Sequence, residues 1–116
     1  MNASPLVTVV MSVYNASETI DLALRSILTQ TYQDWELIVV DDGSTDRTAE
    51  RVMQVKDPRV RFIQEPSGNM GLALRLNQCV RLAKGQYVAR MDADDVSYSR
   101  RLERQVQFLE AHRDID

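Results

Sequence analysis

The feature that most constrains the fold of this chain is an alternation of short apolar runs with segments of helical periodicity. The apolar runs cover residues 6–13, 35–40, 60–63 and 87–91. Runs of this length and composition are typical of parallel strands that are covered on both faces. Because strands that alternate with helices form βαβ units, the pattern predicts an α/β fold with a parallel sheet.

The segments between and after these runs carry apolar residues at helical spacing. They predict four helices, over residues 20–28, 49–53, 73–83 and 102–109. Polar residues that favour helix N-caps precede three of them. The candidates are Asn15 or Ser17 for the first helix, Asp46 for the second, and Ser97 or Ser99 for the last.

Size and charge narrow the class of protein. The chain has 116 residues, which is one domain at most. No apolar run approaches the ~18 residues of a membrane-spanning helix. The formal net charge is -3, whereas domains that bind a nucleic acid backbone are usually basic, so we expect no nucleic acid partner.

The counts of cysteine and histidine limit the chemistry. Cys79 is the one cysteine, so the chain cannot form an internal disulfide. The lack of an internal disulfide fits a reducing compartment. We therefore expect a cytoplasmic protein, in solution or at the inner face of the membrane. His112 is the one histidine, which disfavours a histidine-rich zinc site or a Ser-His-Asp triad. Any metal would be held by carboxylates, which points to a hard cation such as Mg²⁺ or Mn²⁺.

Aspartates follow two of the predicted strands. Asp41 and Asp42 end the second strand, and Asp92, Asp94 and Asp95 follow the fourth. The carboxyl ends of parallel strands meet at one edge of the sheet, where ligands bind. A single aspartate there is equally typical of a cap or a turn. Two groups of aspartates at two strand ends exceed what capping requires, because one cap needs only one carboxylate. Like charges this close repel, and a divalent cation or sugar hydroxyls would relieve the repulsion.

Common phosphate-binding motifs are absent from the sequence. No glycine-rich G-x-G-x-x-G turn follows the first strand, and no G-K-[ST] loop occurs. A nucleoside diphosphate at this edge would therefore need a bridging metal.

Several ordered motifs resemble those of one family, the family 2 inverting glycosyltransferases with the GT-A fold. They are VVMSVYN (9–15), ILTQTY (27–32), WELIVVDDGSTD (35–46), NMGLA (69–73), LN (76–77), ARMDADD (89–95) and RLERQ (101–105). The resemblance covers essentially the whole chain and matches the N-terminal half of that family. It implies a Rossmann-like three-layer sandwich with a mostly parallel sheet.

The resemblance also implies roles for individual residues. Tyr14 and Ser12 would line the nucleobase pocket, and Asp42 would hydrogen-bond the base edge. Asp92 would lie near the ribose, and Asp94 would bind the metal that bridges to the diphosphate. The metal would be Mn²⁺ or Mg²⁺, with Asp94 and Asp92 as its ligands. The implied donor-binding residues are Ser12, Val13, Tyr14, Asp42, Asp92, Ala93 and Asp94.

The function implied by the resemblance is sugar transfer. A nucleotide-sugar donor, with UDP favoured, would give its sugar with inversion to a saccharide or lipid-linked acceptor in surface polysaccharide synthesis. Residues 1–116 would form the nucleotide-binding half of the domain. The family's general base and acceptor pocket come from the C-terminal half, so we expect a fragment that binds donor and metal but carries no catalytic base. We also expect a homo-oligomer through the sheet surface left exposed.

Two other functions stay open at this point. One is a nucleotide-binding or interaction module that catalyses nothing. The other is a phospho-receiver domain, which has a similar length and a magnesium-binding acidic edge. A receiver needs an acidic pair after the first strand and a lysine at the end of a later strand. Here the first strand ends in Ser12 to Asn15, and neither Lys56 nor Lys84 ends a strand.

Overall fold

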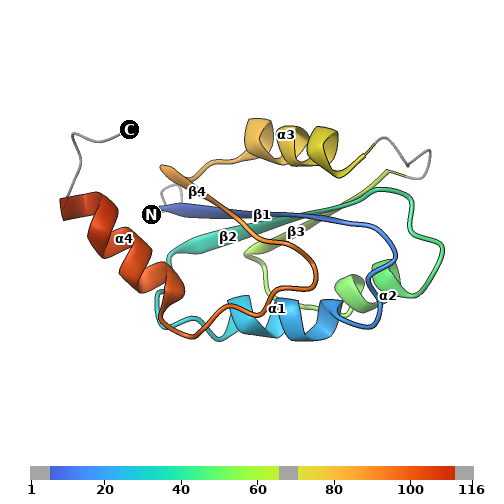
Figure 1. The fold of residues 1–116 in the computed structure, drawn as a ribbon, viewed down its shortest axis with the longest axis horizontal. Helices are drawn as coiled ribbons and strands as arrows, with labels where there is room; N and C mark the ends of the chain where they lie inside the picture. Colours follow the sequence, from blue (N-terminus) through green and yellow to red (C-terminus); the bar gives the residue numbers. More distant parts are fainter. Residues whose placement is uncertain (1–5, 66–70, 112–116) are drawn as a thin grey trace.

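The elements of the fold follow the predicted order (Figure 1). The computed structural model describes residues 6–65 and 71–111; Asn69, Met70 and His112 lie outside this part. The strands are β1 (Val7–Val13), β2 (Trp35–Asp41), β3 (Val60–Gln64) and β4 (Tyr87–Arg90). The helices are α1 (Ile20–Leu28), α2 (Thr48–Met53), α3 (Leu72–Leu82) and α4 (Arg101–Ala111). The predicted α/β class is confirmed.

The four strands form one parallel sheet in the order β3-β2-β1-β4. Val7 of β1 pairs with Trp35 on one side and with Tyr87 on the other. The chain thus builds outward from β1 to β3 and then returns to place β4 on the opposite side of β1. The order reverses between β1 and β4, which is where open parallel sheets bind ligands.

Helices cover both faces of the sheet, which gives three layers (Figure 1). α3 covers one face, where Cys79 packs against Val10, Ile38 and Val40. The larger core lies on the other face, where side chains of α1, α2 and α4 pack on β1 and β2. β1 and β2 are buried along their whole length, which explains why their sequences show no alternation. The predicted three-layer sandwich is confirmed.

Cys79 belongs to this core. It is buried, and desolvation raises the pKa of its thiol to about 11. A thiol that stays protonated at neutral pH is a poor nucleophile. Cys79 is therefore a packing residue.

Three of the predicted helix caps are wrong in detail. The N-cap of α1 is Thr19, not Asn15 or Ser17. The N-cap of α2 is Arg47, although Asp46 accepts the N–H of Thr48 at 2.9 Å and so serves the first turn. Among the bonds of the described residues, no backbone N–H in the first turn of α4 donates to the hydroxyl of Ser97 or Ser99. The N–H of Leu102 instead donates to the side chain of Gln30, which lies beyond α1.

β4 forms one edge of the sheet. A groove of about 490 Å³ lies between β4 and α4, and Val88 and Phe108 are exposed. The homo-oligomer predicted from an uncovered sheet surface is compatible with this edge and stays a prediction. Within residues 6–65 and 71–111, every helix is too short or too polar to cross a membrane.

Candidate functional site

A cleft of about 460 Å³ opens at the carboxyl ends of β1 and β4, at the point where the strand order reverses. One wall comes from the end of β1 and the segment before α1, and the other from the end of β4. The lining residues are Ser12, Tyr14, Asn15, Ala16, Thr19, Arg90, Asp92, Ala93 and Asp94. The structure therefore brings five of the seven predicted donor-binding residues to one cleft.

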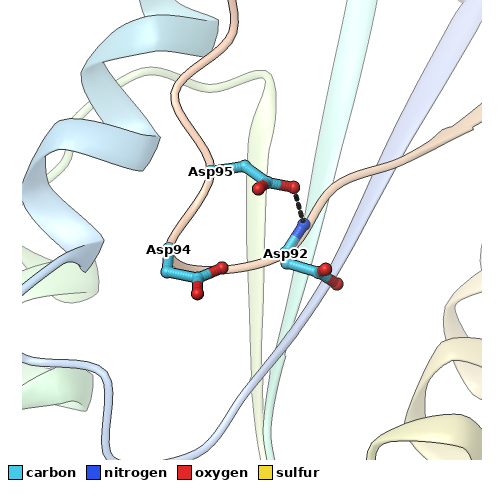
Figure 2. Close-up of side chains that lie close together, drawn as sticks. All are labelled: Asp92, Asp94 and Asp95. Carbon is cyan, nitrogen blue, oxygen red and sulfur yellow. Dashed lines mark hydrogen bonds between the residues drawn. The ribbon is translucent and has the colours of Figure 1, made fainter.

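Asp92, Asp94 and Asp95 form an acidic turn directly after β4. Each offers a carboxylate oxygen within 4.8 Å of the others, and all three residues are exposed. Figure 2 shows them on one turn, where Asp95 Oδ2 accepts the N–H of Asp92 at 3.1 Å. A backbone bond from Asp95 N to Asp92 O closes the same turn. Close carboxylates repel, and oxygen ligands of this kind suit a hard divalent cation.

Arg90 is the nearest cation to the acidic turn among the contacts of the described residues. Its Nη2 lies 3.8 Å from Asp92 Oδ1, and both side chains are largely exposed. Exposed ion pairs of this kind contribute little to stability. The turn therefore keeps most of its negative charge available for a ligand, and its donor set fits a divalent cation.

Ser12 and Tyr14 supply the opposite wall of the cleft. Ser12 is buried, and no partner for its hydroxyl is found in the described part of the chain. Buried hydroxyls are usually hydrogen-bonded, so a ligand in the cleft could satisfy this one. Tyr14 is 44% exposed, which leaves ring surface available for stacking. Val13 is different, because its side chain lies in the core and its carbonyl oxygen accepts the N–H of Asp42.

Asp41 and Asp42, the β2 acidic pair, lie at the same edge of the sheet but do not line the cleft. Both residues are buried, with 3% and 2% of their surface exposed. Asp41 Oδ1 accepts the N–H of Ser44 at 3.0 Å. Asp42 accepts from Arg75 Nε at 2.7 Å and from the N–H of Gly71 at 3.0 Å. The pair is thus engaged within the protein, and contact between Asp42 and a base stays a prediction.

Arg75 is a partner of a predicted site residue, Asp42, that the sequence did not indicate. Its side chain is 11% exposed and pairs with Asp42. A second carboxylate, Glu65 Oε1, lies 4.0 Å from its Nη1. Its neighbour Gln78 donates to Glu65 Oε2 at 2.9 Å. The signal in the sequence was weak, because an arginine on a helix is ordinarily a solvated residue.

The segment after β2 holds the cleft wall in place, a second role that the sequence reading missed. Asn15 has a φ of 49°, in the left-handed region that asparagine tolerates. Its N–H donates to Ser44 Oγ at 2.8 Å, and its Oδ1 accepts the N–H of Thr45 at 2.8 Å. The N–H of Ala16 donates to Thr48 Oγ1 at 2.8 Å. The loop beside Tyr14 is thus tied to the Gly-Ser-Thr-Asp segment.

Asp46 belongs to the same set of bonds. Desolvation acts to raise the pKa of its carboxyl, but hydrogen bonds from Thr48 and Ser17 outweigh it and lower that pKa to about 2. The carboxylate accepts both the hydroxyl and the N–H of Thr48, at 2.5 and 2.9 Å. It also accepts the N–H of Ser17 at 3.2 Å. Asp46 is therefore a structural anion and not a ligand donor.

Comparison with known proteins assigns the class. A family model described as "Glycosyl transferase family 2" matches residues 8–116, and the chain belongs to this family. Among curated relatives, it is 47% identical over 116 residues to the putative glycosyltransferase EpsE of Bacillus subtilis (strain 168). The match covers 97% of this chain and 41% of that relative, so the chain spans about two fifths of its length.

Solved structures show the same fold. The chain matches Staphylococcus aureus TarS residues 1–349 in complex with UDP-GlcNAc at a TM-score of 0.88 and 26% identity, covering 93% of this chain and 32% of that one. It matches the mannosyltransferase PcManGT of Pyrobaculum calidifontis, in complex with GDP-Man and Mn²⁺, at a TM-score of 0.82 and 32% identity, covering 93% of this chain and 33% of that one. The predicted family and its GT-A type of fold are confirmed.

Proposed function

We propose that this chain is the donor-binding part of a glycosyltransferase that binds a UDP-linked sugar together with Mn²⁺ or Mg²⁺. The observation that carries the proposal is the acidic turn, which opens into the same cleft as Tyr14 and the hydroxyl of Ser12, for which the described residues supply no partner. The donors in the two matched solved structures, UDP-GlcNAc and GDP-Man, are both nucleotide sugars. The Mn²⁺ in one of them supports a divalent cation here.

In this proposal each wall of the cleft has its own task. Tyr14 lies against the face of the base, and Ser12 gives its hydroxyl to the base or the ribose. Asp92 accepts from the ribose hydroxyls, and Asp94 with Asp92 holds the cation. When bound, the cation neutralises the charge that develops on the leaving nucleoside diphosphate. Asp42 accepts a hydrogen bond from the base edge through a carboxylate that the bonds from Arg75 and Gly71 already orient.

The rest of the reaction belongs to the proposal as well. Residues 1–116 act as the nucleotide-binding half of a larger domain, and the general base and acceptor pocket come from outside it. An acceptor hydroxyl must be placed in line with the sugar carbon, with a base within ~3 Å of its proton. Inversion, a saccharide or lipid-linked acceptor and a role in surface polysaccharide synthesis are proposed from the family resemblance. A cytoplasmic location is proposed because the chain has the single cysteine Cys79, which fits a reducing compartment.

The test is calorimetric titration of the chain with UDP, with Mn²⁺ present and with excess chelator. We expect binding only when Mn²⁺ is present, because the described residues of the cleft include one arginine and no lysine to hold a diphosphate. Asp94→Asn should weaken the Mn²⁺-dependent binding of UDP on the order of 100-fold. Loss of a group that only supports a metal ligand already has an effect approaching this size, and Asp94 is a direct ligand in this proposal. Equal affinity for UDP in chelator would overturn the proposal.

A matched control separates this effect from a general change of charge. Asp34 is exposed and lies beside the start of β2, far along the strand from Asp41. Asp34→Asn makes the same change in net charge and should leave the affinity for UDP unchanged.

With UDP-sugars and candidate acceptors, the chain alone should show no acceptor-dependent transfer, since it lacks a positioned base in this proposal.

A further inference from the structure

Gln30 is a buried polar residue that the donor site does not use directly. It lies just beyond α1 and is 4% exposed. Its Nε2 donates to Ser26 O at 3.0 Å and to Tyr98 O at 2.8 Å, and its Oε1 accepts the N–H of Leu102 at 3.0 Å. Rotating the amide group by half a turn would make its N–H groups face the N–H of Leu102 and its oxygen face two carbonyl oxygens, so these three hydrogen bonds would be lost. The bonds therefore fix one orientation, in which both amide hydrogens and the amide oxygen have partners.

Thr31 extends the contact on the exposed side. Its N–H donates to Ser99 O at 2.9 Å, and its hydroxyl donates to Glu103 Oε1 at 2.7 Å. Together, Gln30 and Thr31 fasten residues 98–103 to the end of α1. Figure 1 shows the segment after β4 running alongside α1 before it enters α4.

The fastened segment is the far end of the loop that carries the acidic turn. The near end is fixed by Met91, which is buried and donates its N–H to Val10 O at 3.0 Å. Arg101 joins the two ends, because its guanidinium donates to Ser97 Oγ and to Arg90 O, both at 2.9 Å. Arg101 in turn begins α4, whose first turn is held by Gln30 through Leu102.

We propose that Gln30 is a positioning residue for the metal site. By anchoring Tyr98 and the first turn of α4, it fixes the C-terminal end of the loop, and so keeps Asp92 and Asp94, on the turn closed by Asp95 (Figure 2), close enough to share one cation. A loop with both ends fixed has fewer conformations to lose when it binds a cation. The inference rests on the proposed function, since it assumes that the acidic turn binds a divalent cation.

The test compares Mn²⁺ affinity with stability in two variants of the full chain. Gln30→Met keeps an unbranched side chain but removes all three hydrogen bonds. Val52→Ala removes packing from the same core without touching the loop, because Val52 lies on α2. Both should lower the melting temperature, whereas only Gln30→Met should raise the Kd for Mn²⁺, by about tenfold, as is typical for groups that support metal ligands. Both Kd values are measured by calorimetry at a temperature where each variant is folded.

The outcomes separate this inference from the proposed function. If wild type binds Mn²⁺ and Gln30→Met binds it equally well, or no more weakly than Val52→Ala does, the positioning role is wrong and the metal site stands. If wild type binds no Mn²⁺, the proposed site falls and the inference falls with it. If Gln30→Met does not fold, Thr31→Val tests the proposal instead. We expect this variant to raise the Kd for Mn²⁺ about threefold, which corresponds to the loss of one or two exposed hydrogen bonds. An unchanged Kd would overturn the proposal.

Discussion

The acidic turn after β4 and the β2 acidic pair contain the same residue type at the same edge of one sheet, yet their environments are opposite. Asp41 and Asp42 are buried, and their carboxylates accept hydrogen bonds from Ser44, Gly71 and Arg75. The three aspartates of the acidic turn are exposed and crowd their oxygens within 4.8 Å. The difference indicates that protein donors hold the carboxylates of the pair in place, whereas the carboxylates of the turn are available to a cation.

Burial explains the difference. A carboxylate removed from water must be hydrogen-bonded or paired, or it costs several kcal/mol, and the β2 pair meets this condition with protein donors. Carboxylates in water tolerate their mutual repulsion because solvent screens it. The acidic turn can therefore exist without a cation and still gain from one. Substitutions at the two groups should affect different measurements.

The largest effect on stability should come from Asp42→Asn. The neutral amide cannot form an ion pair with Arg75, which would remain a largely buried cation with Glu65 Oε1 at 4.0 Å and the uncharged Gln78 Oε1 at 3.3 Å. Breaking a buried ion pair costs about 3 kcal/mol, which chemical denaturation would measure as a lower midpoint. Asp92→Asn should change the free energy of unfolding by less than about 0.5 kcal/mol, as surface substitutions do. Equal midpoints for the two variants would contradict the contrast drawn here.

A smaller effect should separate two members of the acidic turn. Asp95→Asn keeps an oxygen that can accept the N–H of Asp92, so the turn itself should survive. We expect the Kd for Mn²⁺ to rise about fivefold, below the range typical for loss of a supporting group, and much less than for Asp94→Asn. Calorimetry on both variants would measure the ratio. If Asp95→Asn matches Asp94→Asn, Asp95 is a direct ligand of the cation.

The smallest effect concerns acid stability and Asp46. Its pKa is lowered from 3.8 to about 2 in the folded chain, so its carboxylate stabilises the fold above pH 4 and this contribution is lost as the pH falls through about 2. Asp46→Asn cannot titrate and should flatten the stability profile between those values. Melting temperatures of both proteins from pH 5 to pH 2 would measure this. Parallel profiles over that range would show that Asp46 contributes no such dependence.

The sequence predicted the strands and the acidic turn because both are local features. β1 and β2 appear as continuous apolar runs since helices cover both of their faces. Asp92, Asp94 and Asp95 are near neighbours in the chain, so a single turn suffices to bring them together. Ser12 and Tyr14 join them because parallel strands place their carboxyl ends at one edge.

The contacts that the sequence did not predict join residues far apart in the chain. Asp42 and Arg75 are 33 positions apart, and Gln30 and Leu102 are 72 apart. No periodicity or motif indicates such pairs, since they depend on how α3 and α4 settle on the sheet. The predicted cap of α4 failed for the same reason, because the N–H of Leu102 donates to Gln30, which lies close to it only in the folded chain.

The central claim is that the acidic turn, and not the β2 acidic pair, binds the cation. Paramagnetic broadening by Mn²⁺ of the backbone amide signals in NMR spectra tests it most directly, because the broadening falls steeply with distance from the ion. At substoichiometric Mn²⁺, we predict that the amides of residues 92–95 lose intensity first, followed by Tyr14 and Asn15 across the cleft. Broadening centred on Asp41 and Asp42, or spread evenly over the chain, would contradict the claim.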